Sequence, residues 1–348
     1  MKPTPSDVSA SPATATHGVW KRTRRAALIF ALAATAALAG CSALGSDSPS
    51  TSTGGPLEKS SLTVAIQPSV DAAPYWMAQK LGYFKAEGLD VKTTLAENPI
   101  ISRDKVISGD ADLAELTYPT FFSAVNGGEE LQIVADGTAA SPNSNQLVTV
   151  PTSPVKTVND LAGKRIAITS RNSTSELLTR SVMKDHGVDS SKVTWVQVAL
   201  PNMAAALAQN QVDAAYQPEP FIHAAARTAG AIPVIDVAGP NTSTPDFPVL
   251  GYVAKKTWTE QYPKAMAAFQ RAMLKASRDA QADRSKWEPL VIENTKAVEA
   301  DVMLMTPPSF GSIADPRRIQ RVPDLMAQFG ALPGHIDVST LIVKQATN

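Results

Sequence analysis

Short apolar runs alternate with stretches of helical spacing along this chain, and the whole alternation occurs twice. The apolar runs of the first block are 62–67, 89–96, 111–117 and 131–136. Those of the second block are 164–170, 193–198 and 212–217. Strands that alternate with helices in this way indicate βαβ units and a mainly parallel sheet. The sequence therefore predicts an α/β fold with two similar lobes, each built on its own sheet.

After residue 256 the sequence changes to long helical stretches with few strand signals. We expect these helices to pack on the first lobe, so that the chain crosses between the lobes twice, near 146–152 and 246–252. The predicted boundaries are 61–147 together with 251–348 for lobe 1, and 148–250 for lobe 2.

The N-terminal segment is typical of an export signal rather than of a folded domain. A basic cluster at 21–25 precedes an apolar run of 14 residues, 26–39. This run is too short for a stable membrane-spanning helix, which needs about 20 residues. It ends in Leu-Ala-Gly-Cys at 38–41, which resembles the lipobox of bacterial lipoproteins, and Cys41 is the only cysteine of the chain.

We therefore expect a lipoprotein signal peptide over 1–40, lipidation of Cys41, and a flexible tether over 41–60 that is rich in Ser, Thr, Gly and Pro. The alternative is an ordinary signal peptide with an incidental cysteine. The sequence does not distinguish Sec export from twin-arginine export. By either export route, the folded part of the lipoprotein is expected outside the cytoplasm, held at the outer face of the cell membrane by its lipid anchor.

Composition and motifs argue against several classes of function. Without residues 1–40 the chain carries 27 basic and 31 acidic side chains, whereas a nucleic-acid-binding protein would show a basic excess. One cysteine and four scattered histidines give no metal-ligand spacing. The sequence contains neither a glycine-rich phosphate loop nor a nucleophile elbow. We therefore expect no enzyme activity, no cofactor or metal, and no nucleic-acid partner.

The turns after the predicted strands are the best candidates for function. In open parallel α/β sheets, ligands bind outside the carboxyl ends of the strands, where helix N-termini offer free N–H groups. The candidate ligand-binding residues are Gln67, Asp71, Tyr75, Trp76, Thr117, Tyr118, Arg171, Asn172, Ser173, Thr174, Asn202, Gln217 and Glu219. Arg171 would bind an acidic group of the ligand, and Glu219 would bind an N–H or ammonium group.

These candidates also have structural interpretations, which stay open at this point. Ser173 and Thr174 would cap the helix that they precede. The aromatic candidates would lie in the core. Arg171 would be solvated, and Glu219 would interact with the N-terminus of its own helix.

Four segments, taken in order, resemble the solute-binding proteins of nitrate/sulfonate/taurine-type ABC importers, a family that includes binding proteins for thiamine-pyrimidine precursors. The segments are LTVAIQPSVDAAPYWMAQKLGYFKAEGLDV, VISGDADLAEL, SPVKTVNDLAGKRIAI and NQVDAAYQPEPF. The resemblance covers about 62–255. It implies a type II periplasmic-binding-protein fold whose two lobes, joined by a two-crossing hinge, close on a small ligand. It also implies a monomer that delivers the ligand to a membrane permease powered by a cytoplasmic ATPase.

The resemblance implies a small organic anion or zwitterion as the ligand, such as a sulfonate, taurine or nitrate. Two departures weigh against an alkanesulfonate: Gln217 stands where many relatives have an aromatic residue, and 172–174 replaces a Gly- and Ser-rich turn. A heteroaromatic or aromatic ligand, such as a thiamine-pyrimidine precursor, riboflavin or an aromatic carboxylate, is the alternative. An exported enzyme or a sensor on the same fold is a further one, although the chain lacks the cysteine cluster of the enzymatic relatives.

Overall fold

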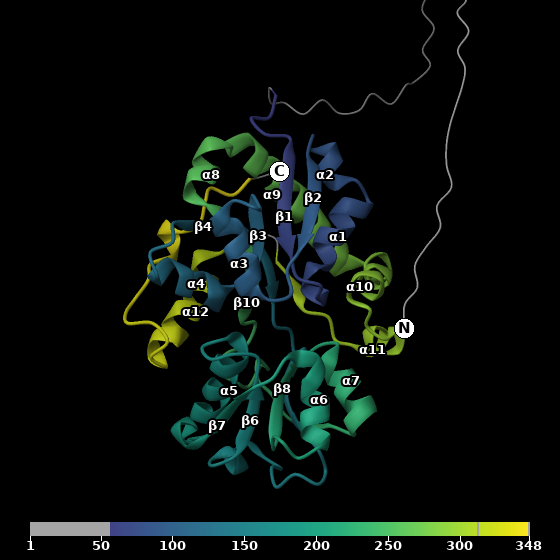
Figure 1. Ribbon diagram of the computed structural model, residues 1–348, viewed down its shortest axis with the longest axis vertical. Helices are drawn as coiled ribbons and strands as arrows, with labels where there is room; N and C mark the ends of the chain where they lie inside the picture. Colours follow the sequence, from purple (N-terminus) through teal and green to yellow (C-terminus); the bar gives the residue numbers. More distant parts are fainter. Residues whose placement is uncertain (1–55, 312, 347–348) are drawn as a thin grey trace, which may run out of the picture. The chain divides into compact units, whose positions relative to one another are not determined.

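The computed structural model describes residues 56–311 and 313–346, and Figure 1 shows how their helices and strands are arranged. All of these residues belong to one compact unit, Ser52–Asn348. The predicted signal peptide, Cys41 and residues 41–55 of the predicted tether lie outside the described residues. Within the described part of the chain, no helix is both long enough and apolar enough to cross a membrane.

The first sheet has six strands in the order β11-β4-β10-β3-β1-β2. Their bounds are Ser61–Ile66 for β1, Asp90–Leu95 for β2, Leu113–Thr117 for β3, Leu131–Ala139 for β4, Pro248–Lys255 for β10 and Ser309–Phe310 for β11. Strands β2 and β3 run parallel to β1. Strand β10 runs antiparallel to β3 and β4, and β11 runs antiparallel to β4.

The second sheet has five strands in the order β7-β6-β8-β5-β9. Their bounds are Asn145–Thr149 for β5, Arg165–Ile168 for β6, Thr194–Gln197 for β7, Ala214–Pro218 for β8 and Ile232–Asp236 for β9. Strands β7 and β8 run parallel to β6, whereas β5 runs antiparallel to β8 and β9. Two α/β sheets are present, as predicted.

Most strands run in one direction, as predicted: β1, β2, β3 and β4 share a direction in the first sheet, and β6, β7, β8 and β9 share one in the second. Both sheets are nevertheless mixed. The reason lies in the two segments that pass from one sheet to the other. Strand β4 ends at Ala139 and β5 begins at Asn145 in the second sheet; the chain returns to the first sheet as β10. No helical crossover of the kind that parallel strands need separates β4 from β5, and each entering strand pairs antiparallel with its neighbours. The residue limits of the two lobes remain a prediction.

Helices cover the sheets (Figure 1). Their bounds are Ala73–Lys80 for α1, Tyr83–Ala86 for α2, Pro99–Ser108 for α3, Tyr118–Asn126 for α4, Thr174–Asp185 for α5, Leu200–Ala208 for α6, Phe221–Ala229 for α7, Lys256–Gln261 for α8, Pro263–Ala282 for α9, Glu288–Thr295 for α10, Glu299–Leu304 for α11 and Pro316–Gln328 for α12. Proline stands in the first turn of seven of them, α1, α3, α4, α6, α9, α10 and α12, where its missing N–H costs no helical hydrogen bond.

The largest aromatic cluster lies between the first sheet and α1, α2 and α9. Tyr252 of β10 stacks on Tyr75 of α1, with ring centroids 6.4 Å apart, and meets Phe269 of α9 edge-on at 5.6 Å. Helix α9 supplies small residues at helical spacing, such as Ala265, Ala268 and Ala272, so it approaches the sheet closely. This packing fixes α1, and with it the turn that precedes α1.

A buried ion pair joins α12 to the centre of the first sheet. The guanidinium group of Arg318 contacts the carboxylate of Asp136 in β4, whose side chain is fully buried. Tyr118 donates its hydroxyl to the same carboxylate at 2.6 Å. Gly251 is required beside this group, because a Cβ at that position would lie 2.7 Å from the Tyr118 hydroxyl and 3.0 Å from the carbonyl oxygen of Ala135.

Candidate functional site

Two acidic side chains lie near the carboxyl ends of the strands of the first sheet. Gln67 directly follows β1, and its backbone N–H donates to Oε2 of Glu115 in β3 at 3.1 Å. Asp71 lies in the short helix η1 (Val70–Ala72), and Thr138 of β4 donates its hydroxyl to Oδ1 of Asp71 at 2.8 Å. Ser69 donates to Oδ2 of Asp71 at 3.3 Å. These contacts tie the two acids to the ends of β1 and β4 and to β3, and we name Asp71 and Glu115 the carboxyl pair.

The Glu115 carboxyl group is fully buried, and its Oε1 has no hydrogen-bond partner among the described residues. Burial and, second to it, the negative charge of Asp71 raise the pKa of Glu115 to about 8, from an ordinary value of 4.5. Burial also raises the pKa of Asp71, although two hydroxyl groups donate to its carboxylate. At neutral pH the Glu115 carboxyl group is therefore largely protonated.

Tyr252 lies beside this carboxyl pair. It is the register partner of Glu115 in the antiparallel β3–β10 ladder, so both side chains lie on the same face of the sheet. The Tyr252 hydroxyl is buried, and it too lacks a hydrogen-bond partner among residues 56–311 and 313–346. A buried polar atom without a partner costs stability, so these two atoms mark a position where a further polar group would be stabilising.

Tyr216 of β8, in the second sheet, is affected by the charge of Asp71. Burial and, second, the charge of Asp71 raise the pKa of the Tyr216 phenol, so Asp71 lies near enough to act on it electrostatically. The Tyr216 hydroxyl donates to Oδ1 of Asn145 in β5. The charge of Asp71, in a turn of the first sheet, therefore acts on a phenol of the second sheet.

Gln217 follows Tyr216 in β8 and is 1% exposed. Both its amide oxygen and its amide nitrogen are buried without a partner in the described part of the chain. An amide side chain can donate two hydrogen bonds and accept two. The described residues therefore use none of the hydrogen-bonding capacity of this side chain.

Glu219 links the second sheet to the C-terminal part of the chain. Its side chain is 2% exposed, and Nδ1 of His223 on α7 lies 2.9 Å from its Oε1. The backbone N–H of Thr306, between α11 and β11, donates to the same oxygen at 3.3 Å. Burial raises the pKa of Glu219 against the lowering effect of His223. The predicted interaction of Glu219 with the N-terminus of its own helix is therefore not the whole account of this residue, because its carboxylate also accepts a hydrogen bond from Thr306.

The turn before α5 forms a group of its own. Asn172 has a left-handed backbone, with φ of 59°, and donates its N–H to Oε2 of the fully buried Glu176 at 2.6 Å. Arg171 places Nη2 3.1 Å from Oε1 of Glu176, and its side chain is half exposed. Ser173 donates to the carbonyl of Ser170 at 2.7 Å. Among the described residues, no hydrogen bond or ion pair joins this turn to Asp71 or Glu115.

The other predicted residues are placed as follows. Tyr75 and Trp76 are buried in the core, and the Tyr75 hydroxyl lies 2.9 Å from that of Thr93 in β2. Tyr118 is engaged by Asp136, as described above. These three aromatic side chains therefore lie in the core, as the structural interpretation of the sequence predicts. Thr117 places its hydroxyl 2.9 Å from that of Thr120, Asn202 is exposed on α6, and the Thr174 hydroxyl is buried without a partner among the described residues.

Sequence reasoning missed several polar residues of this region. Thr138 donates to Asp71, Glu115 accepts from Gln67, and Tyr252 pairs with Glu115 across the sheet. A signal was present for Glu115, because an acidic residue inside the apolar run 111–117 is expensive to bury without a purpose. No signal was present for Tyr252, since its proximity depends on a strand that pairs 137 positions away.

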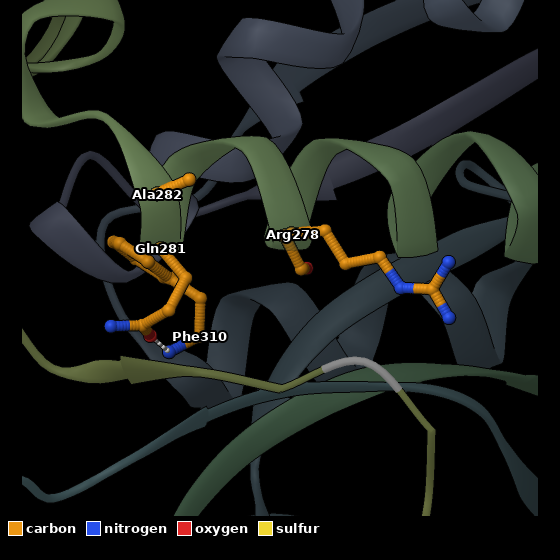
Figure 2. Close-up of a pocket in the computed structure, with 5 residues that line it drawn as sticks. Arg278, Gln281, Ala282 and Phe310 are labelled. Carbon is orange, nitrogen blue, oxygen red and sulfur yellow. Dashed lines mark hydrogen bonds between the residues drawn. The ribbon is translucent and has the colours of Figure 1, made fainter.

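A hollow of about 330 Å³ lies elsewhere, between α9 and β11, and Figure 2 shows its lining. Gln281 accepts the backbone N–H of Phe310 there at 3.1 Å. None of the predicted site residues lines this hollow, so we do not place the ligand site in it. Among the described residues, no group of three or more His, Cys, Asp or Glu could hold a metal ion.

Comparisons with known proteins agree with this architecture. A family model described as "NMT1/THI5 like" matches residues 69–286. A comparison with curated protein sequences found no match. Among solved structures, the periplasmic aliphatic sulphonate binding protein SsuA from Escherichia coli is 16% identical with a TM-score of 0.69, over 83% of this chain and 94% of that chain. The periplasmic nitrate-binding protein NrtA from Synechocystis is 16% identical with a TM-score of 0.66, over 82% and 86%.

A conserved Candida albicans gene product, described as having the generic periplasmic binding protein fold, is also similar. It is 17% identical with a TM-score of 0.67, over 83% of this chain and 97% of that chain. At these identities the likeness shows the fold. The predicted periplasmic-binding-protein fold is confirmed.

Proposed function

The chain belongs to the NMT1/THI5-like family, and on this premise we propose that it is the extracytoplasmic solute-binding component of an ABC importer. The similar solved structures include periplasmic proteins named for sulfonate and nitrate binding, which supports a binding role over catalysis. The proposal includes a membrane permease and its ATPase as partners. It also includes a lipid anchor at Cys41, because a tethered monomer stays close to its permease.

The observation that carries the proposal is the contact between the end of β8 in the second sheet and the segment that leads to β11 of the first. The backbone N–H of Thr306 donates to the buried carboxylate of Glu219 at 3.3 Å. The charge of Asp71, in a turn of the first sheet, also acts on Tyr216 of the second. Polar groups drawn from two lobes surround a ligand when the lobes close and separate when they open. Capture by closure is the mechanism that this arrangement supports.

The charges around this position favour one of the ligand alternatives. Asp71 and Glu115 are carboxyl groups, and Gln217 offers a neutral amide. Arg171, the one cationic residue among the predicted contacts, is half exposed and already paired with Glu176. We therefore propose a ligand rich in N–H donors, such as a pyrimidine-type heteroaromatic compound or a zwitterion that presents its ammonium group, over nitrate or a simple sulfonate.

The proposal is tested on the full protein as purified from its producing cells. Small molecules released on denaturation are identified by mass spectrometry, and the refolded protein is then titrated with the identified compound. Small-angle X-ray scattering with and without that compound should show a smaller radius of gyration in the bound state. An unchanged scattering curve at saturation would contradict capture by closure.

A further inference from the structure

Helix α5 begins beside a buried acid that contacts two arginines. The carboxylate of Glu176 is fully buried. Its Oε1 lies 3.1 Å from Nη2 of Arg171 and 3.6 Å from Nη1 of Arg180. Its Oε2 accepts the backbone N–H of Asn172 at 2.6 Å. One carboxylate of the chain therefore engages two guanidinium groups and a backbone N–H, which are the kinds of donor that bind small oxyanions in proteins.

This cluster lies at the edge of the second sheet where a ligand is expected. Helix α5 follows β6, and ligands of open α/β sheets bind outside the carboxyl ends of the strands. Ser173, the residue before α5, gives the helix no capping hydrogen bond from its side chain. Thr174, in the first turn, is 7% exposed, and its hydroxyl has no partner among the described residues. The start of α5 therefore has polar groups that the described part of the chain leaves unused.

The two arginines differ in what else holds them. Arg180 donates from Nη1 to the carbonyl of Phe329 at 3.1 Å, and its Cζ lies 4.4 Å from the centre of the Phe329 ring. Arg171 has a half-exposed side chain, and within residues 56–311 and 313–346 its one ion-pair partner is Glu176. The Cζ atom of Arg171 also lies 5.9 Å from the centre of the Trp195 ring. Without the Glu176 carboxylate, Arg180 would keep a partner, whereas Arg171 would present an unpaired charge that an anion can reach from solvent.

We propose that Glu176 is a selectivity residue: its carboxylate occupies the anion position formed by Arg171 and the Asn172 N–H, and so excludes nitrate, sulfonates and other anionic groups. This deepens the proposed function and rests on it for the place of the ligand at this sheet edge. An anion at this edge would lie against a buried carboxylate of the same charge, which is unfavourable. The positive charge in excess in the cluster lies on the exposed side chain of Arg171, where water and salt screen its attraction for anions.

A buried ion pair that only holds the fold together would behave differently when the acid is removed. Its loss would reduce stability and create no binding site. A carboxylate that fills an anion position, once removed, leaves a position that an external anion can fill. Glu176→Ala removes the carboxylate and makes room for such an anion. Glu176→Gln removes the charge but leaves an amide of the same shape in place, so the position stays filled.

The test is calorimetry of the whole protein with nitrate and with acetate, two small oxyanions close in size to a carboxylate. Glu176→Ala should bind both anions at least about tenfold more tightly than the wild type, since each gains charge-assisted hydrogen bonds. Glu176→Gln should bind neither. Adding Arg171→Gln to Glu176→Ala should abolish the binding. If Glu176→Ala is too unstable for calorimetry, nitrate should raise its Tm and restore its circular dichroism, with a smaller effect on the wild type.

The matched control is Asp213→Ala, at the opposite edge of the same sheet. Asp213 accepts the backbone N–H of Arg165 at 2.8 Å and pairs with its guanidinium group at 2.8 Å, so this variant also frees an arginine and an N–H. It should gain no nitrate binding. Nitrate binding to the wild type, no binding to Glu176→Ala, or equal binding to Asp213→Ala would each overturn the proposal. These titrations need no native ligand, so their outcome is separate from that of the proposed function, which the released small molecules and the scattering decide.

Discussion

Arg227 on α7 and Asp301 on α11 form a two-point ion pair, with Nε 3.0 Å from Oδ1 and Nη2 2.6 Å from Oδ2. Helix α7 follows the last parallel strand of the second sheet, and α11 lies in the C-terminal part of the chain that leads to β11 of the first. Glu219, His223 and Arg227 are spaced four residues apart, so they share one side of the segment that begins α7. We name these contacts the α7 tie.

Breaking this ion pair should weaken ligand binding, because the pair favours the arrangement in which the two parts of the fold are in contact. Arg227→Ala leaves Asp301 buried without its partner and should raise the Kd by a few-fold, more at low salt than at high salt. Calorimetry at two salt concentrations measures this. The double variant Arg227→Asp with Asp301→Arg should recover part of the affinity; no recovery would mean that the pair does not act on closure.

Glu219→Ala should reduce affinity at least tenfold, because it removes a buried carboxylate that accepts hydrogen bonds from His223 and Thr306. The measurement is the Kd for two ligands that differ only in one N–H group. An equal loss for both ligands would show that Glu219 acts through closure. A larger loss for the ligand that carries the N–H would place Glu219 in direct contact with it. An unchanged Kd would remove Glu219 from the site.

Gln217→Leu should have opposite effects on stability and on binding. The Gln217 amide is buried without partners in the empty protein, and each unsatisfied polar group costs about 1–3 kcal/mol. An apolar side chain of similar size should therefore raise the Tm of the empty protein and weaken ligand binding. Thermal unfolding with and without ligand measures both effects. A lower Tm combined with an unchanged Kd would contradict a ligand-binding role for this amide.

Arg318→Gln should destabilise the fold without changing ligand selectivity. Asp136 is fully buried and loses its charged partner in this variant, and breaking a buried ion pair costs about 3–5 kcal/mol. Denaturant unfolding should show this loss in the free energy of unfolding. The double variant Asp136→Asn with Arg318→Gln should lose less stability than Arg318→Gln alone, since no uncompensated charge remains. A larger loss in the double variant would argue against the ion pair as the cause.

Much of the fold was predictable from local sequence. The apolar runs 62–67, 111–117 and 212–217 became β1, β3 and β8, because buried parallel strands carry continuous apolar residues. The antiparallel entry of β5 and β10 was not predictable in this way, since strand direction depends on which sheet the chain enters. Pairing across a long sequence separation leaves no local pattern.

The site was predicted less completely, for the same physical reason. Asp71, Gln217 and Glu219 follow or end predicted strands, so topology alone pointed to their turns. Glu115 stands within a strand, and only its pairing with Tyr252 and its contact with Gln67 bring it to the site. Tyr75 was expected to face a ligand, yet the side of α1 that carries it packs on the sheet, which the sequence of one short helix does not specify.

The central claim is that this protein binds a small solute through the carboxyl groups and amides where its two sheets meet. The most direct measurement is calorimetry of the ligand-stripped, refolded protein against taurine, an alkanesulfonate, nitrate and a pyrimidine-type precursor, each also titrated into Glu115→Gln. We expect micromolar or tighter binding of an N–H-rich compound that depends on Glu115, and no binding of nitrate. Binding of nitrate or the sulfonate with unchanged affinity in Glu115→Gln would contradict this account.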